Sequence, residues 1–127
     1  MKYLLVLFLV INSYGVDLKA SYSYKEAISQ AKKTNKKVLL YLKAGYCRWC
    51  VKMEKEVLFN SKVTKFINDN YIFLQLDKDN DTYPKQFNTS IIPTTYLINP
   101  TTEEKIHAMY GYVKAPRLID DLSFYND

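Results

Sequence analysis

The sequence is poor in the residues that mark several common classes of protein. Among its 127 residues there are only two cysteines, three glycines and four prolines. Two cysteines exclude a disulfide-dense scaffold, and so little glycine and proline excludes fibrous and low-complexity chains. Hydrophobic residues make up 48% of the chain and aromatic residues 15%, with twelve tyrosines. The chain can therefore bury a hydrophobic core, and its length predicts a single domain.

The sequence also lacks a long block of like charge. There are 18 lysines and arginines against 13 aspartates and glutamates, so the formal net charge is +5 and the pI is about 9.1. The early lysines occur as short pairs, Lys32-Lys33 and Lys36-Lys37, and do not form the cationic stripe that follows a phosphate backbone. We therefore expect no nucleic-acid partner.

The longest apolar run, at residues 3–11, is too short to cross a membrane. It has about the length of the apolar region of a secretory signal peptide, whereas a spanning helix needs about 20 apolar residues. Small residues allow cleavage after Gly15 or after Ala20. We predict a signal peptide within residues 1–20, no stable membrane insertion after cleavage, and export, with the bacterial periplasm as the compartment. An uncleaved membrane anchor is the alternative.

Alternating helix and strand patterns follow in the remaining domain, residues 21–127. Helical periodicity predicts helices at about 24–31, at 47–59, from a cap at Ser61 through residue 67, and from Pro116 onward. Apolar or alternating runs predict four strands, at 38–42, 72–76, 94–98 and 106–110. This order of elements is typical of an α/β fold.

Both cysteines lie at the start of the second predicted helix, as Cys47-Arg48-Trp49-Cys50. The free N–H groups and the positive dipole end of a helix start stabilise a thiolate, which is the form of cysteine that attacks disulfides. Arg48 adds a cation beside Cys47, and Cys50 is close enough to resolve a mixed disulfide. We predict that Cys47 is the nucleophile and Cys50 the resolving thiol. Redox equivalents would be carried by these cysteines, without an added cofactor.

Plainer interpretations of the cysteine pair remain open. A purely structural disulfide would close a very short loop and contribute only about 2 kcal/mol in the chain-entropy model. Zinc would need four ligands, and the chain offers two cysteines and one histidine, His107. Haem attachment is excluded, because Val51 and not histidine follows Cys50. The aspartates at 77, 79 and 81 do not complete a calcium loop, since Thr82 occupies the glycine position, so we expect no metal.

The stretch 38–54, a strand followed by aromatic-Cys-x-x-Cys and a helix, resembles the thioredoxin-fold family. Ile92-Pro93-Thr94, ahead of a predicted strand, matches that family's cis-proline signature. The resemblance extends from about Tyr24 to the C-terminus. The cysteine motif resembles the branch of exported reductases that includes the C-terminal domain of the membrane thiol-disulfide interchange protein. The resemblance implies a thioredoxin fold, with a central mixed four-stranded sheet flanked by helices and an extra N-terminal helix.

The same resemblance implies a thiol-disulfide oxidoreductase that reduces the disulfides of exported proteins through a mixed disulfide. The expected partners are exported proteins with thiols or disulfides, and a membrane protein that donates electrons. The reduction potential of the cysteine pair decides the direction of electron flow. The alternative is a non-catalytic binding or chaperone module with a structural disulfide.

In this family the proline faces the cysteines, and the backbone before it binds the substrate chain. Exposed aromatic side chains beside the sulfurs would add an apolar docking surface. We therefore expect six residues to contact substrate: Tyr46, Arg48, Trp49, Ile92, Pro93 and Thr94.

The proton acceptor of the resolving cysteine is the point at which the sequence departs from the family. The family's buried carboxylate falls on Tyr41 here. Glu54 follows Cys50 by one helical turn on the same face, and we hypothesise that it accepts the proton instead. The alternative is a solvated glutamate paired with a lysine. Lys43, at the end of a strand, is expected to be solvated, and His107 is expected to have no catalytic part.

Overall fold

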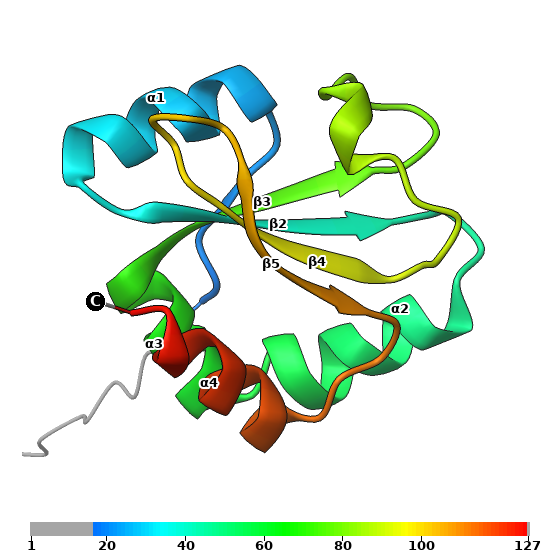
Figure 1. Cartoon of the computed structure of the whole chain (residues 1–127). Helices are drawn as coiled ribbons and strands as arrows, with labels where there is room; N and C mark the ends of the chain where they lie inside the picture. Colours follow the sequence, from blue (N-terminus) through cyan, green and yellow to red (C-terminus); the bar gives the residue numbers. More distant parts are fainter. Residues whose placement is uncertain (1–16, 127) are drawn as a thin grey trace, which may run out of the picture.

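A mixed five-stranded sheet forms the centre of the computed structural model, which describes residues 17–126 (Figure 1). Its strands are β1 (Ala20–Ser21), β2 (Lys37–Lys43), β3 (Tyr71–Asp77), β4 (Thr94–Ile98) and β5 (Lys105–Tyr110). The spatial order is β1-β3-β2-β4-β5. Strand β3 pairs in parallel with β1 and β2, whereas β4 pairs antiparallel with β2 and β5. The four predicted strands are confirmed, and β1 is an additional one.

Helices cover both faces of this sheet (Figure 1). They are α1 (Tyr24–Thr34), α2 (Arg48–Met53), α3 (Ser61–Asn70) and α4 (Ala115–Phe124). Helix α1 lies on one face, and the other three lie on the opposite face. A π-helical segment, η1 (Glu54–Leu58), prolongs α2, and a 3-10 turn, η2 (Lys85–Phe87), precedes β4. Among the described residues no helix has the length and apolar character needed to span a membrane.

Strand β2 divides the hydrophobic core into two halves. Its side chains alternate between the faces, as those of any strand do. Leu39 and Tyr41 pack with α2, α3 and α4, whereas Val38, Leu40 and Leu42 pack with α1. All five are completely buried. A strand buried on both faces must be apolar without interruption, which is why the sequence pattern revealed it.

The N-terminal end of the described chain contributes to the sheet. Ala20 and Ser21 form β1 opposite Phe73 and Leu74 of β3. Two residues are too few to give a readable periodicity, so no strand was expected there. The predicted signal segment and the cleavage position after Gly15 lie outside the described residues, whereas the second position, after Ala20, falls within β1.

Two helix boundaries differ from the prediction. The cap of α3 is Asn60 and not Ser61, because Asn60 has the extended backbone and its side chain accepts the N–H groups of Lys62 and Val63. The second helix is not α-helical throughout: it begins at Arg48, with Cys47 as its cap, and its second half is the π-helical η1. A π segment has one more residue in each hydrogen-bonded ring, which hydrophobic spacing does not reveal.

The hydroxyl of Tyr71 gives the fold a measurable dependence on pH. This buried group donates a hydrogen bond of 2.9 Å to the carbonyl of Leu122 in α4, and burial raises the pKa of Tyr71 from 10.0 to about 12. A raised folded-state pKa means that the stabilisation is complete below pH ~10 and is lost as the pH rises toward ~12.

We expect Tyr71→Phe to lower the free energy of unfolding by about 1 kcal/mol at neutral pH, because the carbonyl of Leu122 loses one of its donors and keeps the N–H of Tyr125. The variant should also lose less stability than the wild type between pH ~10 and ~12. Urea unfolding followed by circular dichroism at several pH values measures both effects. Tyr22→Phe, at an exposed tyrosine, is the matched control. An unchanged alkaline loss in Tyr71→Phe would contradict the assignment.

Candidate functional site

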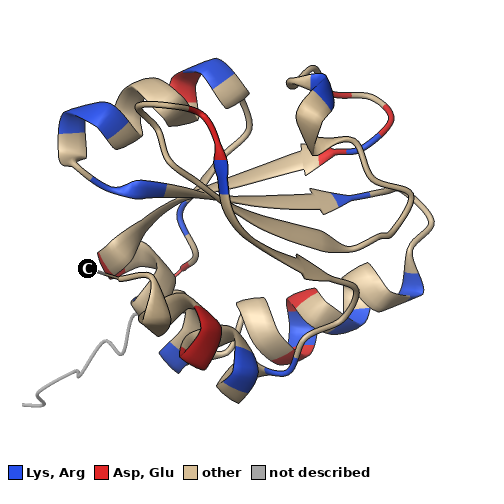
Figure 2. Ribbon diagram, in the orientation of Figure 1, with Lys and Arg blue, Asp and Glu red and all other residues tan. Residues whose placement is uncertain are grey.

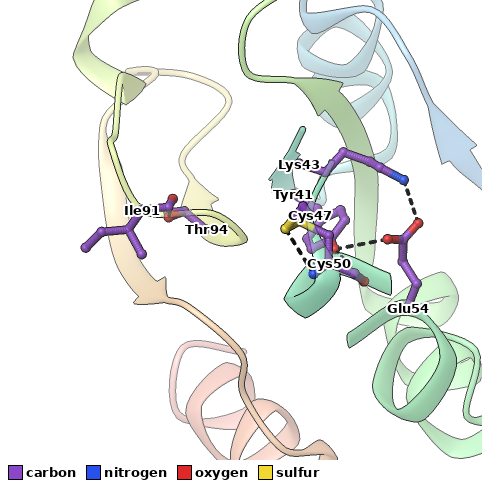
Figure 3. The surroundings of a disulfide bond; sticks show 7 residues. All are labelled: Tyr41, Lys43, Cys47, Cys50, Glu54, Ile91 and Thr94. Carbon is purple, nitrogen blue, oxygen red and sulfur yellow. Dashed lines mark hydrogen bonds and ion pairs between the residues drawn. A yellow bond between two sulfur atoms is a disulfide. The ribbon is translucent and has the colours of Figure 1, made fainter. Parts of the chain in front are cut away.

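The two cysteines form a disulfide at the start of α2 (Figure 3). Cys47 caps the helix with an extended backbone, and its sulfur accepts the N–H of Cys50 at 3.1 Å. Cys47 is partly exposed, whereas Cys50 is only 1% exposed. Only the first sulfur can therefore be reached by another molecule, and the second faces the protein interior.

Tyr41 lies beside the cysteine pair (Figure 3). Its buried hydroxyl is within hydrogen-bond distance of two acceptors, the carbonyl of Cys50 at 3.3 Å and Oε2 of Glu54 at 3.4 Å. Burial, and next the negative charge of Glu54, raise the pKa of Tyr41 far above its usual value. Tyr41 therefore remains a protonated donor at physiological pH.

Glu54 is held between Tyr41 and a lysine. Its Oε1 lies 2.7 Å from Nζ of Lys43, and the Glu54 side chain is only 15% exposed. The expectation that Lys43 is merely solvated is wrong, because the end of β2 lies beside the start of η1. The alternative of a solvated glutamate paired with a lysine is correct about the lysine. Glu54 also lies next to Tyr41, however, and is largely buried.

The loop before β4 lies opposite the disulfide (Figure 3). The Ile92–Pro93 peptide bond in this loop is cis. The N–H of Gly111 donates to the carbonyl of Pro93 at 2.7 Å, and Gly111 has φ +80°, which a residue with a side chain rarely adopts. Thr94 is fully buried, and its hydroxyl donates to the carbonyl of Ile91. Thr94 and Gly111 thus support the loop from within.

The exposed isoleucine of this loop is not the one expected. Ile92 is partly buried and packs against the core on the α1 side, whereas Ile91 is 46% exposed. The chain bends at these residues, and packing against the core decides which of the two isoleucines faces solvent. Ile91 is therefore a residue of the site that the sequence pattern did not reveal.

Aromatic residues directly precede both cysteines in the chain, Tyr46 before Cys47 and Trp49 before Cys50. Tyr46 is fully exposed and Trp49 is 56% exposed. The rings of Trp49 and Tyr112 are 5.9 Å apart, and Nζ of Lys52 lies about 5 Å from both rings, at 5.1 Å and 4.9 Å. The Tyr112 hydroxyl donates to Glu56 at 2.6 Å. The contact of Lys52 with Trp49 could be predicted from the sequence, because the two residues are one helical turn apart. No local sequence pattern predicts the contact of Tyr112 with Trp49, because Tyr112 lies after β5.

The other polar residues considered from sequence have structural contacts. His107 lies 3.2 Å from Asp121 and its ring packs 4.9 Å from that of Tyr125, so it connects β5 to α4. Backbone N–H groups of the turn after β3 donate to Asp77, and these bonds, with a contribution from Lys43, hold the pKa of Asp77 below its usual value. No group of three or more metal-ligating side chains occurs within residues 17–126.

Fold and site together define a thioredoxin-like domain with a Cys-x-x-Cys disulfide. The model of a family described as thioredoxin-like matches residues 19–100, which is more than half of the chain. The chain belongs to this thioredoxin-like family.

Solved structures of thioredoxin-fold proteins superpose on nearly the whole domain. A thioredoxin from Thermus thermophilus has a TM-score of 0.73 and 19% identity, over 85% of this chain and 86% of that one. The DsbH oxidoreductase has a TM-score of 0.69 and 17% identity, over 98% and 93%. The oxidised C-terminal domain of DsbD from Neisseria meningitidis has a TM-score of 0.64 and 23% identity, over 81% and 92%. At these identities the likeness concerns the fold alone.

Curated relatives match a shorter stretch. An uncharacterized protein of Caenorhabditis elegans is 36% identical over 55 residues, which is 43% of this chain and 8% of that protein. Spermatogenesis-associated protein 20 of Mus musculus is 34% identical over 55 residues, 43% of this chain and 7% of that protein. The matched stretch thus spans less than a tenth of the length of these relatives.

The unequal exposure of the two sulfurs leads to a direct test. After reduction, iodoacetamide should modify Cys47 at least about tenfold faster than Cys50, because reagent reaches only the first sulfur. Peptide mapping by mass spectrometry over a time course gives both rates, and the urea-unfolded chain, in which they should become similar, is the control. Equal rates in the folded protein would show that Cys50 is not protected by burial.

Proposed function

We propose that this protein is a thiol-disulfide oxidoreductase that reduces the disulfides of exported proteins. The observation that carries the proposal is the unequal exposure of the two cysteines. Cys47 is accessible at the cap of α2, whereas Cys50 is buried within the same helix. A structural cross-link needs no such inequality, whereas an exchange reaction needs an attacking and a resolving cysteine.

The reaction proceeds in two exchange steps. In the reduced protein the Cys47 thiolate attacks one sulfur of the substrate disulfide, a mixed disulfide forms, and the other substrate sulfur leaves as a thiolate. The Cys50 thiolate then attacks the Cys47 sulfur, which releases the second substrate thiolate and forms the Cys47–Cys50 disulfide. Two electrons pass to the substrate, and the protein requires reduction by a dithiol donor before the next cycle.

The start of α2 favours the first step. The Cys47 sulfur lies at the helix cap, where it accepts a backbone N–H, and Arg48 follows it directly. Both the positive helix end and the adjacent cation favour the thiolate over the thiol.

Glu54 supplies the proton acceptor for the second step. Apolar surroundings disfavour a thiolate, so the buried Cys50 needs a base nearby. Tyr41 cannot be this base, since its raised pKa keeps it protonated. Its hydroxyl lies between the Cys50 backbone and Glu54, whose other carboxylate oxygen lies 2.7 Å from Nζ of Lys43. Glu54 thus accepts the proton of Cys50, and the Tyr41 hydroxyl orients the Glu54 carboxylate.

The proposal also includes the compartment of the protein, the direction of electron flow and the source of the electrons. The apolar run at residues 3–11 supports export to a bacterial periplasm. The resemblance of the cysteine motif to the branch of exported reductases supports a reductive direction with a membrane donor. The reduction potential of the cysteine pair, measured against glutathione, tests the direction, because a potential above that of the compartment would make the protein an oxidant.

Trapping separates this function from a non-catalytic binding module. Cys50→Ser should accumulate mixed disulfides with secreted proteins through Cys47, because the resolving step is blocked. Cys47→Ser, the matched control, should accumulate few, because Cys50 is buried. Non-reducing gels and mass spectrometry measure the adducts. An absence of adducts in Cys50→Ser would favour the module with a structural disulfide.

Glu54→Gln should slow the Cys50-dependent release of a trapped thiol by at least about tenfold at neutral pH, and move the midpoint of its pH profile upward, since the base is lost. Tyr41→Phe should have a smaller effect in the same direction. Stopped-flow measurement from pH 5 to 9 gives the profiles. Glu26→Gln, at an exposed glutamate of α1, is the control. A pH profile of Glu54→Gln identical to that of the wild type would rule out Glu54 as the acceptor.

A further inference from the structure

The exposed sulfur adjoins a surface of aromatic rings and cations. We call it the cationic–aromatic face and define it as Tyr46, Arg48, Trp49, Lys52 and Tyr112. Four of these residues belong to α2 or the loop before it, and Tyr112 joins them from the segment between β5 and α4. The face therefore begins at the residues on either side of Cys47.

The acidic residues close to this face already have partners. Glu54 pairs with Lys43, and Glu56 accepts the hydroxyl of Tyr112. By contrast, Arg48 and Lys52 make no ion pair with any residue of the described part of the chain, although both are exposed. Figure 2 shows basic residues along α2 from its first turn. Two exposed cations without an ion pair in the described residues therefore follow Cys47 on α2, and Glu56, bound to Tyr112, is the exposed carboxylate in contact with the face.

Arg48 and Lys52 stand one helical turn apart, on the same side of α2. Like charges at this spacing repel each other and weaken a helix. Since the chain supplies no carboxylate to either of them within its described residues, a carboxylate from outside would relieve this repulsion. Arginine is suited to that role, because its planar guanidinium can bind both oxygens of a carboxylate.

Three residues of the face, Trp49, Lys52 and Tyr112, contact one another in the absence of a partner. Lys52 lies against the rings of both Trp49 and Tyr112, and Tyr112 is fixed by its bond to Glu56. These contacts restrict the Trp49 ring and the Lys52 side chain. A pre-organised surface loses less conformational freedom on binding.

We propose that the cationic–aromatic face docks an acidic segment of the partner protein, with carboxylates beside the cysteine that reacts with Cys47. The carboxylates pair with Arg48 and Lys52, while apolar side chains of the segment contact Tyr46 and, across the disulfide, Ile91. Opposite charges raise the rate of encounter as well as the specificity of docking. This proposal rests on the proposed function and names the class of substrate that the same site selects.

The test uses three synthetic peptides of equal length, each with one cysteine activated as a thiopyridyl disulfide. The residues on both sides of the cysteine are glutamate, glutamine or lysine. Each peptide reacts with Cys47 of the reduced Cys50→Ser variant, and the released thiopyridone gives the second-order rate constant. We expect the glutamate peptide to react at least about tenfold faster than the lysine peptide in low salt, and the ratio to fall as salt is added.

Removal of the charges of Arg48 and Lys52 shows whether the preference for the glutamate peptide depends on the cationic–aromatic face. Arg48→Gln combined with Lys52→Gln should reduce the glutamate-to-lysine ratio to near one. Lys32→Gln combined with Lys33→Gln removes the same charge from the last turn of α1 and should leave the ratio nearly unchanged. Because the ratio compares peptides on one variant, a change in the reactivity of Cys47 itself cancels.

The outcomes are distinguishable. Failure of Cys47 to react with any of the three peptides would overturn the proposed function. Reaction with all three at similar rates, or an equal loss of preference in both double variants, would overturn the acidic partner and leave the exchange function intact.

Discussion

Burial of β2 on both faces and both edges is the constraint on which the site depends. Its five central side chains are inaccessible to water, and β3 and β4 occupy its two edges. Such a strand cannot shift by one residue without moving all of its side chains to the wrong face. The end of β2 at Lys43 is therefore firmly placed, and the short loop that follows delivers Cys47 to the start of α2.

The same strand determines the electrostatics beneath the disulfide. Because side chains alternate along β2, Tyr41 and Lys43 point to the same side of the sheet, toward the helix that carries Glu54. A carboxylate in such a place is costly unless it is paired and hydrogen-bonded. Here the negative charge comes from the helix, the positive charge from the end of the strand, and the tyrosine hydroxyl completes the group.

The two sides of the disulfide thus have different chemistry. The inner side, around Cys50, offers a tyrosine hydroxyl and a carboxylate that is ion-paired with Lys43, which suits the proposed movement of a proton away from the reduced Cys50. The outer side, around Cys47, offers exposed rings and two cations without ion pairs in the described chain, which suits the approach of another protein. The proposed exchange with a partner and the proposed resolution within the protein need these two different environments.

Local patterns along the chain are enough to predict much of this protein. Largely apolar runs of strand length mark strands buried on both faces, and so the sequence predicted β2, β3 and β4, together with the helices and the cysteine pair at the start of α2. Tertiary packing decided the pairing of Lys43 with Glu54, the contact of Tyr112 with Trp49, and the exposure of Ile91 in place of Ile92. Each of these depends on side chains from separate elements, and periodicity within one element carries no information about what packs against it.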